Sequence, residues 1–344
     1  MSFELLRTLC GIPAPPGRED AFRTFLIEQL SPYADDVTTD AMGNVFFRRK
    51  GTGPHPRTIM LAAHMDEISF LVRHITKEGF LYVQPLGGFD PRVLDAQRVW
   101  IHGRERILGV FGAKPTHFTT PEERTKAVPL EDMFIDTGRS PEEVNALVRI
   151  GDPVTLEREL VEMGAFYTGK TLDDRVGVYV MIEAFKRFAS SQDTIVAVAT
   201  VQEEVGVRGA KVAAFGLEPD IGIALDITIA ADIPGVEERN WCVRLGHGVA
   251  IKIMDGYSIS DPRLVEFFRL LAEENSFRYQ MEILPRGGTD AGGMQLARSG
   301  IPVCTISIPC RYAHSVVESV HREDVERSIE LVRCFCEQSH RFTA

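Results

Sequence analysis

Four short apolar segments of this chain are each followed by acidic or histidine side chains. The segments and the side chains that follow them are 58–63 with His64 and Asp66, 194–201 with Glu203 and Glu204, 221–225 with Asp226, and 303–308 with His314. Short runs of this kind are typical of strands buried on both faces of a sheet. Because ligands bind beyond the carboxyl ends of strands in open α/β sheets, we expect these side chains to meet at one edge.

The expected cluster has the composition of a site for two divalent cations. The five side chains that would bind them are His64, Asp173 (from the start of a helical segment), Glu204, Asp226 and His314. Histidine and carboxylate ligands without cysteine fit Zn²⁺ or Co²⁺ and also accommodate Mn²⁺. Three carboxylates, two cations and a bridging hydroxide sum to zero charge, and two metals acidify the water that they share, so that its hydroxide becomes the nucleophile.

Two further acids would support this chemistry. Glu203 is adjacent to Glu204 and is free to act as the general base. Asp66 lies two residues after His64 and can accept the other imidazole N–H, which fixes the histidine tautomer. Each residue alone also fits a plainer role, such as a helix cap or a solvated loop. The coincidence at four strand ends favours the metal site.

Other functions stay open on the residues alone. A metal-dependent deacylase of small N-acyl amides would use similar ligands. A glycosidase with two carboxylates and no metal would leave His64 and His314 without a role. A scaffold protein with a vestigial site would not need an intact ligand set.

Composition excludes several other classes of protein. The chain has 344 residues, with 38 Lys and Arg against 49 Asp and Glu, and a formal charge of −11. This balance argues against nucleic acid as the main partner. No apolar run approaches the length of a membrane span, and the N-terminus does not resemble a signal peptide. The six cysteines form no CxxC pair. We therefore expect a reduced, cytoplasmic protein without a membrane partner.

The elements that position the cluster are strands alternating with helices. Helical patterns are expected at 19–30, 172–188, 262–274 and 322–336. This alternation predicts a mainly parallel α/β sheet with helices on both faces. Residues 68–162 differ, because short β-like runs separated by glycines predict a small β-barrel or sandwich. We expect one discontinuous catalytic domain, 1–67 and 163–344, with 68–162 inserted. Residues 114–130 should form a long surface loop available for subunit contacts.

Six short motifs run along the chain, namely 63–68 (AHMDEI), 169–177 (GKTLDDRVG), 201–206 (VQEEVG), 224–226 (ALD), 287–291 (GGTDA) and 311–315 (RYAHS). In these motifs the chain resembles the M42 metallopeptidases, aminopeptidases of the glutamyl, leucyl and deblocking types, some of which carry an endoglucanase label. The motifs follow the family order from about residue 5 to about residue 335. The resemblance implies an aminopeptidase that removes N-terminal residues from peptides.

The resemblance also implies individual roles. His64 and Asp226, with Glu204 and His314, would be ligands of two metals, and Asp173 would bridge them. Glu203 would be the general base and later the acid, and Asp66 the partner of His64. Substrate-binding roles would fall to Thr289 and Asp290 in the pocket wall. Apart from the resemblance, the position of Arg286 beside 287–291 would let it pair with an acidic side chain of the substrate, and a solvated or structural arginine is the alternative.

The family fold joins a phosphorylase/peptidase-like α/β domain to a PDZ-like β domain used in assembly. Members commonly form dodecamers, so we expect a homo-oligomer. Two positions depart from the family pattern: Val316 replaces a proline after His314-Ser315, and Ser69 replaces a glycine. Neither departure changes a ligand.

Overall fold

The apolar segments identified in the sequence form the centre of one large sheet. In the computed structural model, which describes residues 2–343, four strands lie side by side in the order β12 (Thr194–Thr200), β3 (Thr58–His64), β13 (Ile221–Ile229) and β16 (Val303–Arg311). All three neighbouring pairs are parallel. The prediction of a mainly parallel sheet is confirmed.

Shorter strands extend this sheet to 11 strands within the described residues. They are β1 (Asp36–Thr39), β2 (Val45–Arg49), β10 (Val161–Met163), β11 (Phe166–Gly169), β14 (Val249–Met254), β15 (Tyr279–Ile283) and β17 (Glu318–His321). Strand β2 pairs antiparallel with β12, and β17 pairs antiparallel with β16. Most outer pairings are antiparallel and so differ from the centre of the sheet, whereas β14 and β15 pair parallel with each other.

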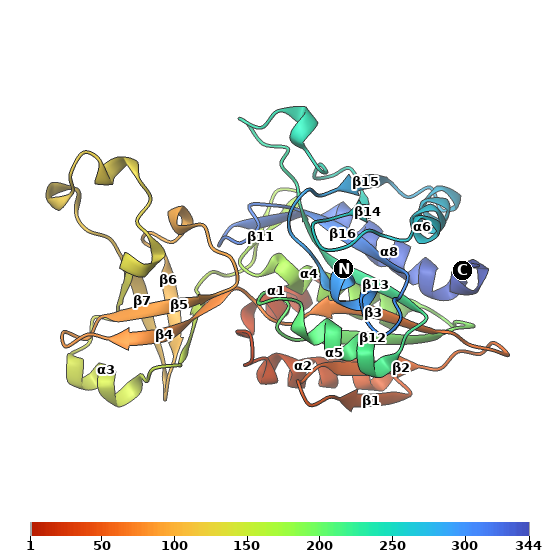
Figure 1. Ribbon diagram of the computed structural model, residues 1–344, viewed down its shortest axis with the longest axis horizontal. Coiled ribbons are helices and arrows are strands. Elements are labelled where there is room, and N and C mark those ends of the chain that lie inside the picture. The colour runs from red at the N-terminus through yellow and green to blue at the C-terminus, as the bar shows by residue number, and fades with distance from the viewer. Residues whose placement is uncertain (1, 344) are drawn as a thin grey trace.

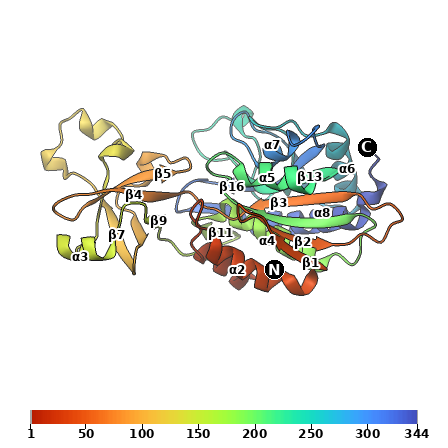
Figure 2. The ribbon, with the colours of Figure 1, turned by 60° about the horizontal axis from the view of Figure 1, so that its bottom comes forward.

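Helices cover both faces of the sheet. They are α1 (Phe3–Gly11), α2 (Asp20–Leu30), α4 (Leu172–Arg187), α5 (Arg208–Leu217), α6 (Pro262–Glu274), α7 (Asp290–Gln295) and α8 (Arg322–Gln338). On β3, Ile59, Leu61 and Ala63 belong to the core shared with α1, α2, α4, α6 and α8, whereas Met60 and Ala62 belong to the core shared with α5 and α7. Figure 2 shows α5 and α7 above the sheet and α2 and α4 below it. Each large aliphatic side chain buried in this way stabilises the fold by about 1.5–3 kcal/mol.

The inserted segment forms a closed β-barrel beside the α/β body (Figure 1, orange to yellow). Its strands are β4 (Ser69–Ile75), β5 (Leu81–Leu86), β6 (Arg98–His102), β7 (Arg106–Gly112), β8 (Phe134–Asp136) and β9 (Pro153–Leu156). Phe70, Ile101 and Ile135 are fully buried in its own core. The predicted fold class, an α/β sheet with an inserted barrel, is confirmed. Strand β8 and helix α3 (Pro141–Leu147) were not predicted from the sequence.

Short 3-10 turns connect several elements. They are η1 (Ser31–Tyr33), η2 (Pro91–Val93), η3 (Thr116–Phe118), η4 (Glu123–Thr125), η5 (Leu130–Asp132), η6 (Glu238–Asn240) and η7 (Ser339–Arg341). The predicted loop at 114–130 contains η3 and η4 and is largely exposed. Within residues 2–343, no helix has both the length and the apolar character required to cross a bilayer.

Candidate metal centre

The site lies at the end of β3, where the neighbouring strands β13 and β16 continue for several more residues. Strand β3 ends at His64, and its last pairing with β13 is Ala62 with Ala224. Strand β13 continues beside β16 as far as Ile229. The expectation that Asp226 follows the end of a strand was therefore wrong, because the ladder with β16 keeps this residue inside β13. In this register Asp226 lies beside His64, and both side chains are almost fully buried.

Asp173 lies between the two predicted histidine ligands. Its Oδ1 is 3.2 Å from Nε2 of His64, and its Oδ2 is 3.1 Å from Nε2 of His314. The two histidines come from the end of β3 and from the turn after β16, while Asp173 comes from the first turn of α4. Each carboxylate oxygen of Asp173 thus faces a different histidine, which is the arrangement that a bridging ligand requires.

The other two predicted ligands complete this cluster. Oε2 of Glu204 is 3.6 Å from Nε2 of His314. Ligand atoms of His64, Asp173 and Glu204 lie within 4.8 Å of one another, as do those of His64, Asp226 and Asp174. All five predicted metal ligands are therefore brought together.

Buried carboxylates hold the main chain of these ligands. Asp66 accepts hydrogen bonds from the backbone N–H groups of Glu203 and Glu204, at 2.9 and 3.1 Å. Asp174 accepts one from the backbone N–H of His64, at 3.2 Å. Nδ1 of His64 lies 3.1 Å from the backbone carbonyl of Asp66 but 3.6 Å from its carboxylate. The main chain of Asp66 is thus the closer partner of the imidazole, because its side chain is turned to the Glu203-Glu204 segment.

The inserted barrel also contributes to the site, which the sequence did not reveal. The backbone carbonyl of Gly88, in the loop after β5, lies 2.8 Å from Nδ1 of His314. This contact orients Nε2 toward the carboxylates. Gly87 lies against Glu204, since a Cβ at position 87 would be 3.2 Å from Oε2 of that residue. The only signal in the sequence was the Gly87-Gly88 pair, which indicated a turn but not that this turn contacts His314 and Glu204.

The cluster contains more buried carboxylates than positively charged groups, and this imbalance shifts their pKa values. Burial and the neighbouring Asp173 raise the pKa of Glu204 to about 8, and the same two causes raise the pKa of Asp226 to about 8. Burial also raises the pKa of Glu203 well above its ordinary value. Asp173 differs, because hydrogen bonds from His314 and His64 outweigh its burial and lower its pKa.

These residues fit a pair of divalent cations. Oε1 of Glu204 is buried and has no hydrogen-bond partner within the described chain, so this carboxylate oxygen is available to bind a metal ion. Bound divalent cations would offset the negative charge of these buried carboxylates. The donor set of two imidazoles and three carboxylates suits Zn²⁺ or Co²⁺.

The predicted ligands and Glu203 line a cavity of about 970 Å³. Arg286 and Lys252 also line it, the first exposed and the second buried. Thr289 and Asp290 are buried behind the wall, where Thr289 caps α7 and Asp290 accepts a hydrogen bond of 2.5 Å from the hydroxyl of Thr200. Of the three predicted substrate-binding residues, Arg286 alone faces the cavity.

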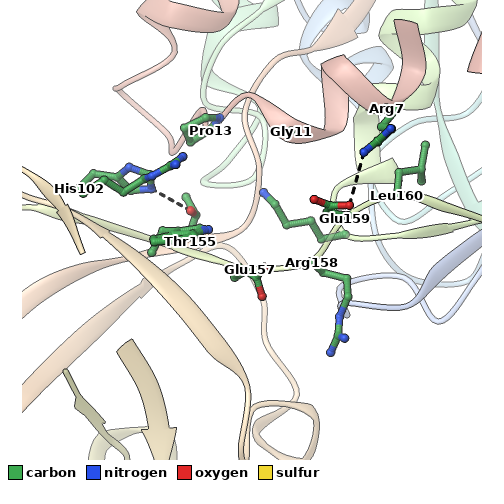
Figure 3. Close-up of a pocket in the computed structure, with 12 residues that line it drawn as sticks. Arg7, Gly11, Pro13, His102, Thr155, Glu157, Arg158, Glu159 and Leu160 are labelled. Atoms are coloured by element: carbon green, nitrogen blue, oxygen red, sulfur yellow. Dashed lines mark hydrogen bonds and ion pairs between the residues drawn. The ribbon is translucent and has the colours of Figure 1, made fainter. Parts of the chain in front are cut away.

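A second, smaller hollow of about 280 Å³ lies between α1 and the barrel (Figure 3). On its barrel side, Nε2 of His102 lies 2.8 Å from the hydroxyl of Thr155. On its other side, Lys170 forms a 2.5 Å ion pair with Glu67. Because the predicted ligands face the larger cavity, we assign the chemistry there.

Comparisons with known proteins agree with this geometry. The sequence profile of a family described as M42 glutamyl aminopeptidase matches residues 43–331. The chain belongs to the M42 peptidase family. A putative aminopeptidase from Acetivibrio thermocellus is 38% identical, covering 96% of this chain and 97% of the relative. A lysyl aminopeptidase from Pyrococcus furiosus is 34% identical, covering 98% and 97%.

Solved structures of M42-like enzymes share the whole fold. An aminopeptidase from the archaeon Desulfurococcus kamchatkensis superimposes with a TM-score of 0.94 at 41% identity, covering 97% of this chain and 94% of that chain. A TET1 peptidase from Pyrococcus horikoshii, which can assemble into a tetrahedron or a large octahedral shell, superimposes with a TM-score of 0.87 at 31% identity, covering 97% and 99%. The predicted family and the predicted aminopeptidase class of hydrolase are confirmed. Membership of this metallopeptidase family implies divalent metal ions.

The two departures from the M42 pattern are both buried. Val316 is buried and packs into the core of the barrel. Ser69 begins β4 and is fully buried. Both positions join the barrel to the α/β body, so their side chains belong to the connection between the two parts.

Proposed function

We propose that this chain is a two-metal aminopeptidase in which Asp173 bridges the cations. The observation that carries the proposal is the position of Asp173, with one oxygen facing His64 and the other facing His314. His64 and Asp226 would hold one cation, and Glu204 and His314 the other. When bound, the two cations would supply Lewis-acid chemistry, polarising the scissile carbonyl and lowering the pKa of a nearby water molecule.

Glu203 is proposed to move the proton. Its side chain lines the cavity, and its backbone N–H donates a hydrogen bond of 2.9 Å to Asp66, which holds the main chain of Glu203 in place. Its carboxylate takes a proton from the attacking water and delivers it to the leaving amine. Burial raises the pKa of Glu203, which makes the protonated form accessible for the second step. Asp66 keeps Glu203 and Glu204 in place without joining the reaction.

The cavity is proposed to accept the N-terminal residue of a peptide. Arg286, exposed at the cavity lining, would pair with an acidic side chain of the substrate. Thr289 and Asp290 would support the wall from behind. A panel of aminoacyl p-nitroanilides with Glu, Leu and Lys side chains tests this assignment, and loss of Glu preference in Arg286→Ala supports it.

The chain is further proposed to work as a homo-oligomer, with residues 68–162 as the assembly domain and a dodecamer as the expected form. The exposed loop 114–130 on the barrel supports this role, since Phe118 in it is 74% exposed. A reducing compartment such as the cytoplasm is proposed because all six cysteines are free. Light scattering of the purified protein measures the subunit number.

The decisive experiment combines metal analysis with Glu203→Gln. We expect two divalent ions per chain in both proteins, and a kcat on leucine p-nitroanilide that is lower by about 10²- to 10⁴-fold in the variant. Zn²⁺, Co²⁺ and Mn²⁺ are each restored to chelated protein to identify the active metal. Turnover of N-acyl amino acids in place of aminoacyl anilides would favour a deacylase, and metal-independent cellulose hydrolysis would favour a glycosidase. Near-normal turnover in metal-replete Glu203→Gln would refute the role of Glu203.

A further inference from the structure

Glu318 makes contacts that the sequence motifs did not reveal. It begins β17 and its side chain is 1% exposed. Its Oε1 accepts a hydrogen bond of 2.8 Å from the backbone N–H of His314, and its Oε2 accepts one of 3.0 Å from the backbone N–H of Asp173. One buried carboxylate therefore joins the main chains of two proposed metal ligands that lie 141 positions apart, on the turn after β16 and on the first turn of α4.

The turn that carries His314 needs support. Tyr312 and His314 have φ angles of 60° and 61°, in the left-handed region that costs a residue with a side chain about 1–2 kcal/mol. The main chain of Glu318 is fixed in the sheet, because it pairs with Gly169 of β11. Glu318 thus extends from a rigid strand to a turn that does not adopt its conformation by local preference.

The chemistry of the contact requires a carboxylate. Two N–H donors converge on the side chain, and only a carboxylate offers an acceptor oxygen to each of them. An amide of the same shape would direct its NH₂ group at one of the two N–H groups, leaving that buried donor unsatisfied. The carboxylate is therefore matched to holding two ligands at a fixed separation.

We infer that Glu318 is a positioning residue that sets the separation of Asp173 from His314 and thereby the affinity of the cation they share. The inference rests on the proposed two-metal function. Glu318 is not itself one of the residues that line the cavity, and it has no part in the proton transfers. Its effect on the reaction would pass entirely through the two ligands that it holds.

The test compares Glu318→Gln with a matched variant remote from the metals. Asp324 is a buried carboxylate that also accepts two backbone hydrogen bonds, from Gly246 at 2.7 Å and from Gly248 at 2.8 Å. Asp324→Asn removes the same kind of acceptor without touching a proposed ligand. The full-length proteins are freed of metal by a chelator, and Co²⁺ binding is measured by equilibrium dialysis.

For Glu318→Gln we expect one of two Co²⁺ sites to weaken by about 10- to 100-fold, with the other unchanged. Asp324→Asn should bind both ions as the unaltered protein does, even where its thermal midpoint falls. At saturating Co²⁺ the Glu318→Gln protein should recover kcat while KM for leucine p-nitroanilide stays constant. A role limited to closing the turn would lower thermal stability equally with and without metal and would not move the Co²⁺ affinity.

Unchanged affinities in Glu318→Gln, or an equal loss in Asp324→Asn, would overturn the inference. If Glu318→Gln does not fold, Glu318→Asp replaces it, because the shorter carboxylate keeps the charge but cannot reach both N–H groups. The same weakening of one site is expected there, and two unaltered sites would again overturn it. If the unaltered protein binds no Co²⁺, the proposed function itself fails, which is a different result from an unaffected variant.

Discussion

Gly87 offers a direct test of the barrel's contact with the metal centre. Its φ angle is +90°, and an added Cβ would lie 2.7 Å from Cγ2 of Ile68 and 3.2 Å from Oε2 of Glu204. In Gly87→Ala the backbone conformation costs about 1–2 kcal/mol. Relief of the overlap with Ile68 costs a further 1–3 kcal/mol or so. We expect a loss of about 2–5 kcal/mol in the free energy of unfolding, together with weaker metal binding because Glu204 is displaced.

Gly151 provides the control for the backbone contribution. Its φ angle is also +90°, and among the described residues nothing outside its chain neighbours lies within 4 Å of an added Cβ. Gly151→Ala should therefore lose about 1–2 kcal/mol in urea unfolding and keep the Co²⁺ dependence of the unaltered protein. If Gly87→Ala matches Gly151→Ala in both stability and Co²⁺ dependence, the reasoning about this contact is refuted.

Three further predictions follow from charges and exposure. The thermal midpoint of the chelated protein should fall as the pH rises from 5 to 8. In the folded protein Glu204 and Asp226 each have a pKa of about 8 and keep their protons over this range, whereas in the unfolded chain their ordinary pKa values of 4.5 and 3.8 mean that the protons are released. A thermal midpoint that rises over this pH range would contradict the prediction. Lys252→Met should lower the free energy of unfolding in urea by about 3–5 kcal/mol, because the Nζ atom of buried Lys252 lies 3.2 Å from Glu282 and 3.5 Å from Asp255, which would lose their cation. Lys77 is exposed, and a loss in Lys252→Met no larger than that in Lys77→Met would contradict this prediction. Phe118→Ser should lower the mass measured by light scattering without changing the fold, and an unchanged mass would exclude Phe118 from the subunit contact.

The sequence predicted the parts of the site that depend on local pattern. His64, Glu203 and Glu204 were found because buried strands are short apolar runs with clear ends. Asp226 was placed correctly beside this cluster, but it lies inside β13 and not after its end, because the end of β13 is set by pairing with β16. Pairing of that kind depends on a partner strand far along the chain, so the end of the apolar run was not the end of the strand.

Elements in the barrel were harder to predict. Helix α3 has a capping box in which Ser140 and Glu143 each accept from the other's backbone N–H, with Pro141 at its first position, so the sequence carries a local signal for the start of this helix. Strand β8 has three residues and pairs with β5 and β7, and so short a run carries no readable period.

The supporting contacts of the site were out of reach for a different reason. Gly88 and His314 are 226 positions apart, and Glu318 and Asp173 are 145 apart. Each contact depends on how separate parts of the fold are placed, whereas a motif describes neighbours in the chain. A single sequence therefore reveals ligands more readily than the groups that hold them.

The contact of Gly88 with His314 limits the modularity of this protein. A barrel inserted into a loop suggests a part that can be exchanged between relatives or removed with a short linker. Here the inserted part supplies the carbonyl that orients His314 and the glycine that leaves room for Glu204. A chimera that carries a foreign barrel would need the same Gly87-Gly88 corner at the same height above the sheet. Recombination would succeed only where the exchanged part begins after this corner.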